Sequence, residues 1–231
     1  MIRYEIQGDN LEIVRIRLSP GDEVIAEAGK MIYKQSQVAW RTTMHGKGIG
    51  GKLLSGLKRK LTGESLFLTH FSCPVDEGEV GFAGDFPGRL RPVHLDPGQS
   101  VLVQRDGFVA AEASVQLDIA LTKRLGAGFF GGEGFILQRL RGPGIAFIHA
   151  GGDFVEFDLA SGETLEVDTG CLVCFDESVE YSIGLAGGIA TSLFGGEGLF
   201  LATLTGPGKV TLQTLTLNKL RRELGASDPS S

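Results

Sequence analysis

The chain has 231 residues, of which 42% are apolar, and a formal net charge of −6. This apolar content excludes a disordered chain, and the acidic balance disfavours a general nucleic-acid-binding protein. No segment approaches the roughly 18 consecutive apolar residues of a membrane-spanning helix, and three cysteines do not make a disulfide framework. We therefore expect a cytoplasmic protein with a sizeable core, no cofactor and no nucleic-acid partner.

A segment with the same pattern occurs three times along the chain. Each copy opens with Leu-x-x-Gly, continues with alternating polar and apolar residues, and reaches a second glycine at Gly29, Gly107 or Gly170. Alternation with a period of two places neighbouring side chains on opposite faces of a strand. We expect strands at 22–27, 99–104 and 163–168. Asp106-Gly107 also predicts a two-residue hairpin turn.

More strands follow each of these segments. Short apolar or alternating runs predict second strands at 37–42, 114–121 and 178–185, and third strands at 65–71, 134–140 and 198–204. Fourth strands are expected at 144–150 and 209–217, after turns that contain Gly-Pro-Gly, because proline and glycine end regular structure. Only 217–224 has the pattern of a helix, and 226–231 is expected to be a disordered tail.

These elements predict one β module used three times. The repeats run from about 11–94, 95–158 and 159–217, within a single domain that spans 1–225. A repeated unit buries its apolar face against its siblings. Many short strands at regular spacing indicate an all-β sandwich with a jelly-roll-like body, ending in one short helix.

The glycine-rich stretch 45–56 raises the question of a phosphate-binding loop. Gly46, Gly51 and Lys52 fit the Walker A pattern, but Leu53 stands where a serine or threonine would bind magnesium. The preceding strand alternates as an antiparallel strand does, whereas a phosphate loop follows a buried parallel strand and begins a long helix. We expect a loop that glycine allows to turn tightly. A second interpretation is a docking loop for an anionic membrane surface, formed by Leu53, Leu57, Lys58, Arg59 and Lys60.

Side chains with catalytic potential are scattered. Glu64, Glu133 and Glu197 occupy the same place in the three repeats. Their repetition favours a structural role, accepting backbone N–H bonds from the glycine-rich turns, over acid–base catalysis. Cys171 and Cys174 form a C-x-x-C motif without the helix that a redox motif needs, so we expect two buried thiols. No catalytic residue and no metal ligand is assigned.

Apolar residues in the glycine-rich loops motivate the main functional hypothesis. Phe129, Phe130, Leu193 and Phe194 lie in segments expected at the surface, where apolar clusters mark contacts with partners or membranes. We expect a non-enzymatic scaffold that self-associates as a trimer or a larger ring.

The three-fold repeat, the segment AEAGKMIY and the two FGGEG-to-GPG segments resemble the AIM24-like family from Tyr4 to about Leu217. That family combines bacterial proteins of unknown function with a fungal protein tied to the organisation of mitochondrial membranes. The resemblance implies a shortened double-stranded β-helix, similar to the subunit of the tryptophan-responsive RNA-binding attenuation protein, and a membrane-organising role. It carries no catalytic residues.

This type of fold also leaves a cupin-like enzyme that uses a small ligand or a metal as an alternative. The four histidines, His45, His70, His94 and His149, are isolated in the sequence. His70 and His149 fall on strands of different repeats and are the pair that the fold could bring together, although a histidine satisfied within its strand is the simpler expectation.

Overall fold

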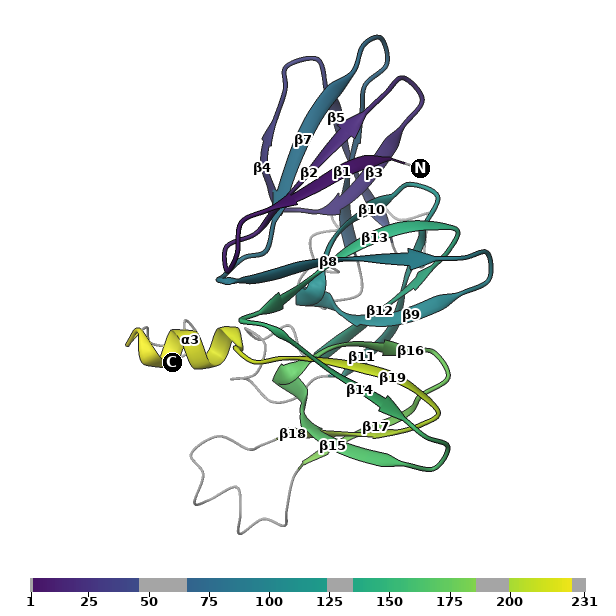
Figure 1. Ribbon diagram of the computed structural model, residues 1–231, viewed down its shortest axis with the longest axis vertical. Coiled ribbons are helices and arrows are strands. Elements are labelled where there is room, and N and C mark those ends of the chain that lie inside the picture. Colours follow the sequence, from purple (N-terminus) through teal and green to yellow (C-terminus); the bar gives the residue numbers. More distant parts are fainter. Residues whose placement is uncertain (1, 46–65, 124–134, 186–199, 226–231) are drawn as a thin grey trace, which may run out of the picture.

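The computed structural model describes residues 2–45, 66–123, 135–185 and 200–225. Within these ranges the chain forms four antiparallel sheets, stacked one above another along the longest axis of the molecule (Figure 1). One short helix, α3 (Leu217–Glu223), follows the last strand. The all-β prediction and the single C-terminal helix are both confirmed.

We name the sheets A to D in the order of stacking. Sheet A has the order β1 (Arg3–Gln7), β2 (Ile13–Leu18), β7 (Gly78–Ala83), β4 (Met31–Lys34). Sheet B has the order β5 (Ala39–His45), β6 (Leu66–Ser72), β3 (Glu23–Glu27), β10 (Phe108–Glu112), β13 (Gly144–Gly151), β8 (Gly88–Leu95). Sheet C has the order β11 (Gln116–Lys123), β12 (Phe135–Arg141), β9 (Ser100–Gln104), β16 (Leu172–Asp176), β19 (Gly208–Gln213), β14 (Phe154–Leu159). Sheet D has the order β15 (Thr164–Asp168), β18 (Phe200–Thr205), β17 (Glu180–Leu185).

Sheets B and C are built in the same way from two half-sheets. In sheet B the half β5–β6–β3 comes from the first repeat and joins the half β10–β13–β8 of the second repeat, to which β8 belongs by its pairing with β13 although it precedes the boundary predicted at residue 95. In sheet C the half β11–β12–β9 comes from the second repeat and joins the half β16–β19–β14 of the third, to which β14 belongs by its pairing with β19 although it precedes the boundary predicted at residue 159. We call these contacts, β3 with β10 and β9 with β16, the internal joints. Each repeat is therefore bonded to the next through the middle of a shared sheet.

Three apolar cores lie between the stacked sheets. Val80 and Phe82 of sheet A pack with Phe71 and Phe147 of sheet B. Further cores join sheet B to sheet C and sheet C to sheet D. Because the two faces of each middle sheet belong to different cores, the central strands of sheets B and C are apolar on both faces. This is why β10 and β16 show nearly continuous burial instead of alternation.

The glycine after each Gly-Pro pair is required by the backbone. Gly144 and Gly208 have φ values of +141° and +144°, where a side chain is strained. A Cβ atom on either residue would also approach a serine hydroxyl, Ser114 Oγ at 2.7 Å or Ser178 Oγ at 2.8 Å. The two turns carry the chain from β12 in sheet C to β13 in sheet B, and from β18 in sheet D to β19 in sheet C. The predicted turns are therefore confirmed, and the structure adds that each of them carries the chain from one sheet to another.

The hairpin predicted at Asp106-Gly107 is wrong. Residues Arg105–Gly107 form a single turn of 3-10 helix, stabilised by the side chain of Gln104, which accepts a bond from the Asp106 N–H at 2.7 Å. The strands on either side, β9 and β10, lie in different sheets and do not pair. A two-residue sequence signal cannot distinguish a hairpin from a corner between sheets, because both need the same local reversal.

The structure also tests the predictions for the strand before the glycine-rich stretch and for the end of the last strand. The strand before the glycine-rich stretch, β5, pairs antiparallel with β6 at the end of sheet B, which removes the parallel strand that a phosphate loop follows. The last strand ends at Gln213, four residues before the predicted limit, because Thr216 begins α3 by accepting a bond from the Lys219 N–H. In the part of the chain that the structure describes, no helix has the length and apolar character needed to cross a bilayer.

Candidate interaction surfaces

The outer strand of sheet A, β4, is an unpaired edge among the described strands. It pairs with β7 in the register Met31–Phe82, Tyr33–Gly81 and Lys34–Val80, with a bulge after Met31. Strands β10 and β16 pair with β13 and β19 with the same bulge. Strand β4 is thus the first-repeat counterpart of β10 and β16, but it lacks the partner that those strands have at the internal joints.

The outer strand of sheet D, β15, is the matching edge at the other end of the molecule. It pairs with β18 on one side, as β3 pairs with β6 and β9 with β12. In sheets B and C the counterparts of β15 are β3 and β9, and each pairs on its other side with β10 or β16. No described strand occupies that side of β15. Figure 1 shows β4 and β15 in the two terminal sheets, with sheets B and C between them, so one copy cannot pair its own two edges.

Apolar side chains are exposed near β4 at positions that are buried in the other repeats. Met31 and Ile32 are 37% and 59% exposed, whereas their second-repeat counterparts Phe108 and Val109 are fully buried. On the next strand of the same repeat, Trp40 is 60% exposed. Its counterpart Leu117 is buried against Ile25 and Leu68 of the preceding repeat. The first repeat therefore carries the apolar groups of a joint without a preceding repeat to cover them.

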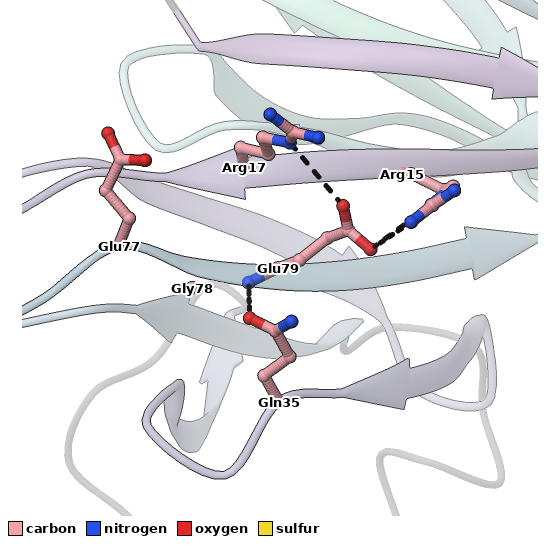
Figure 2. A pocket seen from close by; sticks show the side chains of 6 residues that line it. All are labelled: Arg15, Arg17, Gln35, Glu77, Gly78 and Glu79. Atoms are coloured by element: carbon pink, nitrogen blue, oxygen red, sulfur yellow. Dashed lines mark hydrogen bonds and ion pairs between the residues drawn. The ribbon is translucent and has the colours of Figure 1, made fainter.

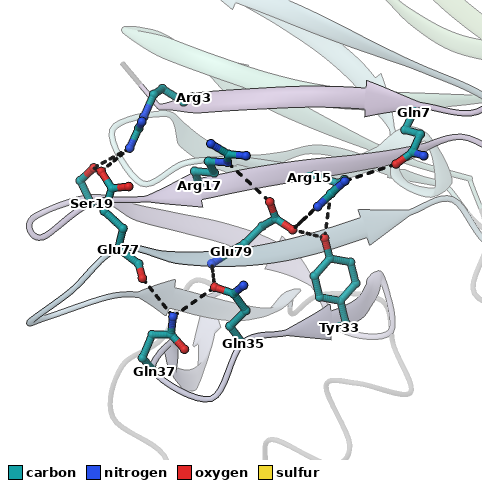
Figure 3. Close-up of polar contacts among 10 residues, drawn as sticks. All are labelled: Arg3, Gln7, Arg15, Arg17, Ser19, Tyr33, Gln35, Gln37, Glu77 and Glu79. Atoms are coloured by element: carbon teal, nitrogen blue, oxygen red, sulfur yellow. Dashed lines mark hydrogen bonds and ion pairs between the residues drawn. The ribbon is translucent and has the colours of Figure 1, made fainter.

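The outward face of sheet A beside this edge carries a polar cluster centred on Glu79. Its carboxylate accepts bonds from Tyr33 Oη at 2.5 Å and Arg15 Nη2 at 2.9 Å, and it lies 3.6 Å from Arg17 Nε (Figure 3). The Glu79 backbone N–H donates to the Gln35 side chain at 3.0 Å, which ties the cluster to the segment after β4. A hollow of about 290 Å³ lies over these residues, bordered also by Glu77 and Gly78 (Figure 2).

The charges of this cluster are balanced internally. The hydrogen bonds from Tyr33 and Arg15 lower the pKa of Glu79, and the bond to Glu79 raises the pKa of Arg15, so both groups are ionised at neutral pH. Burial, followed by the bond to Glu79, raises the pKa of Tyr33. The Tyr33 ring lies on Gly81, where a Cβ atom would come within 2.4 Å of the ring. The arrangement fixes Tyr33 and the edge of β4 in place, and the pKa of Glu79 is moved away from the value near 7 that suits a general base.

A second ionised group is buried below sheet A. Lys30 is buried, and its ammonium lies 2.5 Å from the Asp85 carboxylate. The neighbouring His149 is buried in edge-on contact with the Phe86 ring, at 5.1 Å between ring centroids. Burial, with the positive charge of Lys30 adding to it, lowers the pKa of His149 to about 4. The imidazole is therefore neutral at physiological pH and packs as part of the interior.

The histidine pair considered for a metal site is not brought together. His70 on β6 contacts Glu23 and Thr43, whereas His149 lies on β13, with β3 and β10 between the two strands. Three strand spacings amount to about 14 Å, which is beyond shared coordination. In the ranges that the structure describes, no three His, Cys, Asp or Glu side chains are placed to hold a metal ion.

The two thiols of the C-x-x-C motif are free. Cys174 is buried on β16, while Cys171 ends a turn of 3-10 helix and is half-buried. Burial raises the pKa of the Cys174 thiol to about 11 and also raises the pKa of Cys171. A raised pKa lowers the thiolate fraction, which is the reverse of what a redox motif needs.

The residues predicted for interaction and for turns all lie outside the described residues. They are Leu53, Leu57, Lys58, Arg59, Lys60, Phe129, Phe130, Leu193 and Phe194 for the loops, and Glu64, Glu133 and Glu197 for the turns, together with the glycine-rich stretch Gly46–Lys52. Sequence reasoning missed the β4 and β15 edges. The available signal was the lysine, Lys34, at a position where the later repeats have Ala111 and Phe175.

Comparisons with known proteins cover nearly the whole chain. The model of the family described as "Mitochondrial biogenesis AIM24" matches residues 4–215. An uncharacterized protein of Streptococcus pyogenes serotype M6 is 30% identical over 223 residues, which is 95% of this chain and 88% of that protein. A crystal structure of a Streptococcus pyogenes protein superposes with a TM-score of 0.76 at 26% identity, covering 97% of this chain and 99% of the other.

Proposed function

The chain belongs to the AIM24 family, and we propose that it is a non-enzymatic β-scaffold that joins copies of itself through two of its unpaired sheet edges, β4 and β15. The observation that carries this proposal is the order of the strands. Apart from the additional strand β1, sheets A and D correspond to the two halves of the sheet that is complete twice inside the chain, once as sheet B and once as sheet C. In the proposed scaffold, two copies pair their edge strands in the same way as two successive repeats pair at an internal joint.

Pairing with another strand is favourable at the β4 and β15 edges. An unpaired strand exposes backbone N–H and C=O groups that pair readily with another strand, and natural proteins either protect such edges or use them. The β4 edge is short and carries one charge, Lys34, but the exposed apolar side chains of Met31, Ile32 and Trp40 lie beside it. Clustered apolar side chains beside an open edge are typical of a binding surface.

Self-assembly is the property by which this chain would carry out the membrane-organising role that the family resemblance implies. A scaffold acts by presenting many copies of a surface at fixed spacing, which a self-joining chain provides without catalysis. The carboxylate of Glu79 is tied into a local network with Arg15 and Tyr33, and this supports a structural role over a reactive one for that cluster.

A proline at the β4 edge tests the proposal. The Gln35 N–H donates to Glu79 O at 2.9 Å, so alternation along the strand turns the backbone N–H of Lys34 away from β7 and toward the open edge. Lys34→Pro removes that outward donor while leaving the bonds to β7 intact. We expect the variant to be folded and monomeric when its mass is measured by light scattering after size exclusion.

Asp158→Pro is the matched control. Asp158 is exposed on β14, one of the two edge strands of sheet C. Its second-repeat counterpart β8 is likewise an edge strand of sheet B, whereas its first-repeat counterpart β2 pairs with β1 inside the same chain. The Thr214 N–H donates to Asp153 O, and the same alternation turns the Asp158 N–H outward. This variant should keep the mass of the unmodified protein. If Lys34→Pro assembles as well as Asp158→Pro does, the β4 edge is not used and the proposal fails.

A further inference from the structure

Resting on that proposed function, we infer that the β4 edge of one copy binds the β15 edge of the next copy, head to tail and in a single register. In that register Lys34 lies opposite Glu166, with Tyr33 opposite Val167 and Gln35 opposite Leu165. The partner is therefore a second copy of this chain, and the joint has a charged cross-strand pair where both internal joints have apolar pairs.

The register follows from the two internal joints. At the first, Ala110, Ala111 and Glu112 lie opposite Ala26, Ile25 and Val24. At the second, Cys174, Phe175 and Asp176 lie opposite Val103, Leu102 and Val101. The pairing of β4 with β7 makes Tyr33, Lys34 and Gln35 the first-repeat counterparts of Ala110, Ala111 and Glu112. The pairing of β15 with β18 makes Val167, Glu166 and Leu165 the third-repeat counterparts of Val103, Leu102 and Val101.

Backbone geometry at the two edges agrees with this register. The outward position of Lys34 follows from the bond between Gln35 and Glu79. On the other edge, the Gly206 N–H donates to Glu163 O at 2.9 Å, so alternation along β15 turns the N–H and C=O of Glu166 away from β18. Lys34 and Glu166 thus both point backbone groups at the open edges, as the two residues of a hydrogen-bonded antiparallel pair must. A shift by one residue would leave these groups unmatched.

The side chains at the centre of the joint are complementary in charge. The internal joints hold apolar pairs at this place, Ala111 with Ile25 and Phe175 with Leu102. Lysine opposite glutamate is a favourable cross-strand pair. Nearby, Trp40 is the counterpart of Leu117, which packs on Leu68 of the preceding repeat. By the same geometry Trp40 covers Leu201, the third-repeat counterpart of Leu68.

The charges also select the direction of assembly. Pairing two β4 edges about Lys34 would place lysine opposite lysine, and pairing two β15 edges about Glu166 would place glutamate opposite glutamate. Like charges directly opposite each other destabilise a strand pair. The head-to-tail joint is therefore favoured, and a heterologous joint of this kind closes into a ring or continues as a filament.

Exchange of the two charges tests the pair. Lys34→Glu or Glu166→Lys alone replaces an attractive pair with a repulsive one, and each should weaken association about tenfold at low salt. The double variant Lys34→Glu/Glu166→Lys should return the dissociation constant close to that of the unmodified protein. If the double variant associates no better than the single ones, the two residues do not face each other.

Paired cysteines test the register and separate it from the proposed function. Opposed Cα atoms of a hydrogen-bonded antiparallel pair lie about 5.5 Å apart, within reach of a disulfide. The double variant Lys34→Cys/Glu166→Cys should form covalent oligomers under mild oxidation, seen on a non-reducing gel. The control Lys34→Cys/Thr164→Cys also places both backbones outward, but it joins diagonal positions about 7–8 Å apart and should cross-link far less.

The outcomes lead to different conclusions. Cross-linking of the first pair alone supports both the register and the assembly. Cross-linking of the control pair, in a protein that still assembles, overturns the register and leaves self-association standing. An absence of cross-linked oligomers in a protein that is monomeric by light scattering overturns both. Mixing the single variants Lys34→Cys and Glu166→Cys should give mixed dimers as the covalent product, and dimers of either variant alone would overturn the head-to-tail direction.

Discussion

Replacing Phe147 with alanine should lower the free energy of unfolding by about 3–5 kcal/mol, the usual cost of truncating a buried phenylalanine. Phe147 is fully buried on β13, in the core between sheets A and B, and its ring meets the Tyr4 ring edge-on at 4.9 Å between centroids. It belongs to the second repeat but fills the core of the first. The substitution therefore removes packing that holds two repeats together, in addition to apolar area. Urea unfolding followed by fluorescence gives the change in midpoint and slope.

Phe157→Ala is the control for this prediction. Phe157 lies on β14 and is 36% exposed, so the same change of side chain leaves a smaller cavity and should cost clearly less. Equal losses for the two variants would show that Phe147 is not part of a closed core between sheets, and the stacked arrangement of repeats would be in error.

Stability should fall as the pH is lowered from about 6.5 to about 4, because of His149. The folded protein holds the pKa of this imidazole at about 4, while in the unfolded chain it returns to its ordinary value near 6.5. The contribution is complete above pH 6.5, declines as the unfolded chain takes up a proton that the folded protein does not bind, and is lost at about pH 4. The difference amounts to up to about 3 kcal/mol.

His149→Gln isolates this effect from the carboxylates that titrate in the same range. Glutamine is the residue of the third repeat at this place, where Gln213 donates from its side-chain amide to Gly170 O at 2.7 Å. The variant should show a shallower loss of stability between pH 6.5 and 4, measured by urea unfolding at a series of pH values. Identical pH profiles for the two proteins would mean that His149 is not held neutral in the folded state.

The extent to which the fold could be predicted from the sequence depends on which interactions decide each element. The strands at 99–104 and 163–168 were found because alternation and turn residues are local signals. Strands such as Leu172–Asp176 carry no alternation, since both of their faces are buried in different cores, and their pairing is decided by contacts with other repeats. The corner at Asp106-Gly107 was misassigned for the same reason. Its local sequence encodes the reversal of direction, and only the packing of the sheets decides which sheet receives the chain.

The candidate surfaces were harder to predict than the fold. An open edge is defined by a missing strand, and no local pattern in Met31–Lys34 records whether β4 has a neighbour. The comparison of repeats contained part of the answer, because Lys34 stands where Ala111 and Phe175 close the internal joints. It acquired meaning only when β15 at the other end of the molecule showed Glu166 at the complementary position. The charges are 132 residues apart in sequence, and only the repeated sheet order relates them.

The most direct test of self-association is the native mass of the unmodified chain. Light scattering after size exclusion, or native mass spectrometry, at micromolar concentration and low salt should give assemblies whose masses are whole multiples of 24.6 kDa. Because the joint contains an ion pair, higher salt should shift the population toward smaller species. A single species of 24.6 kDa across that concentration range would contradict the account.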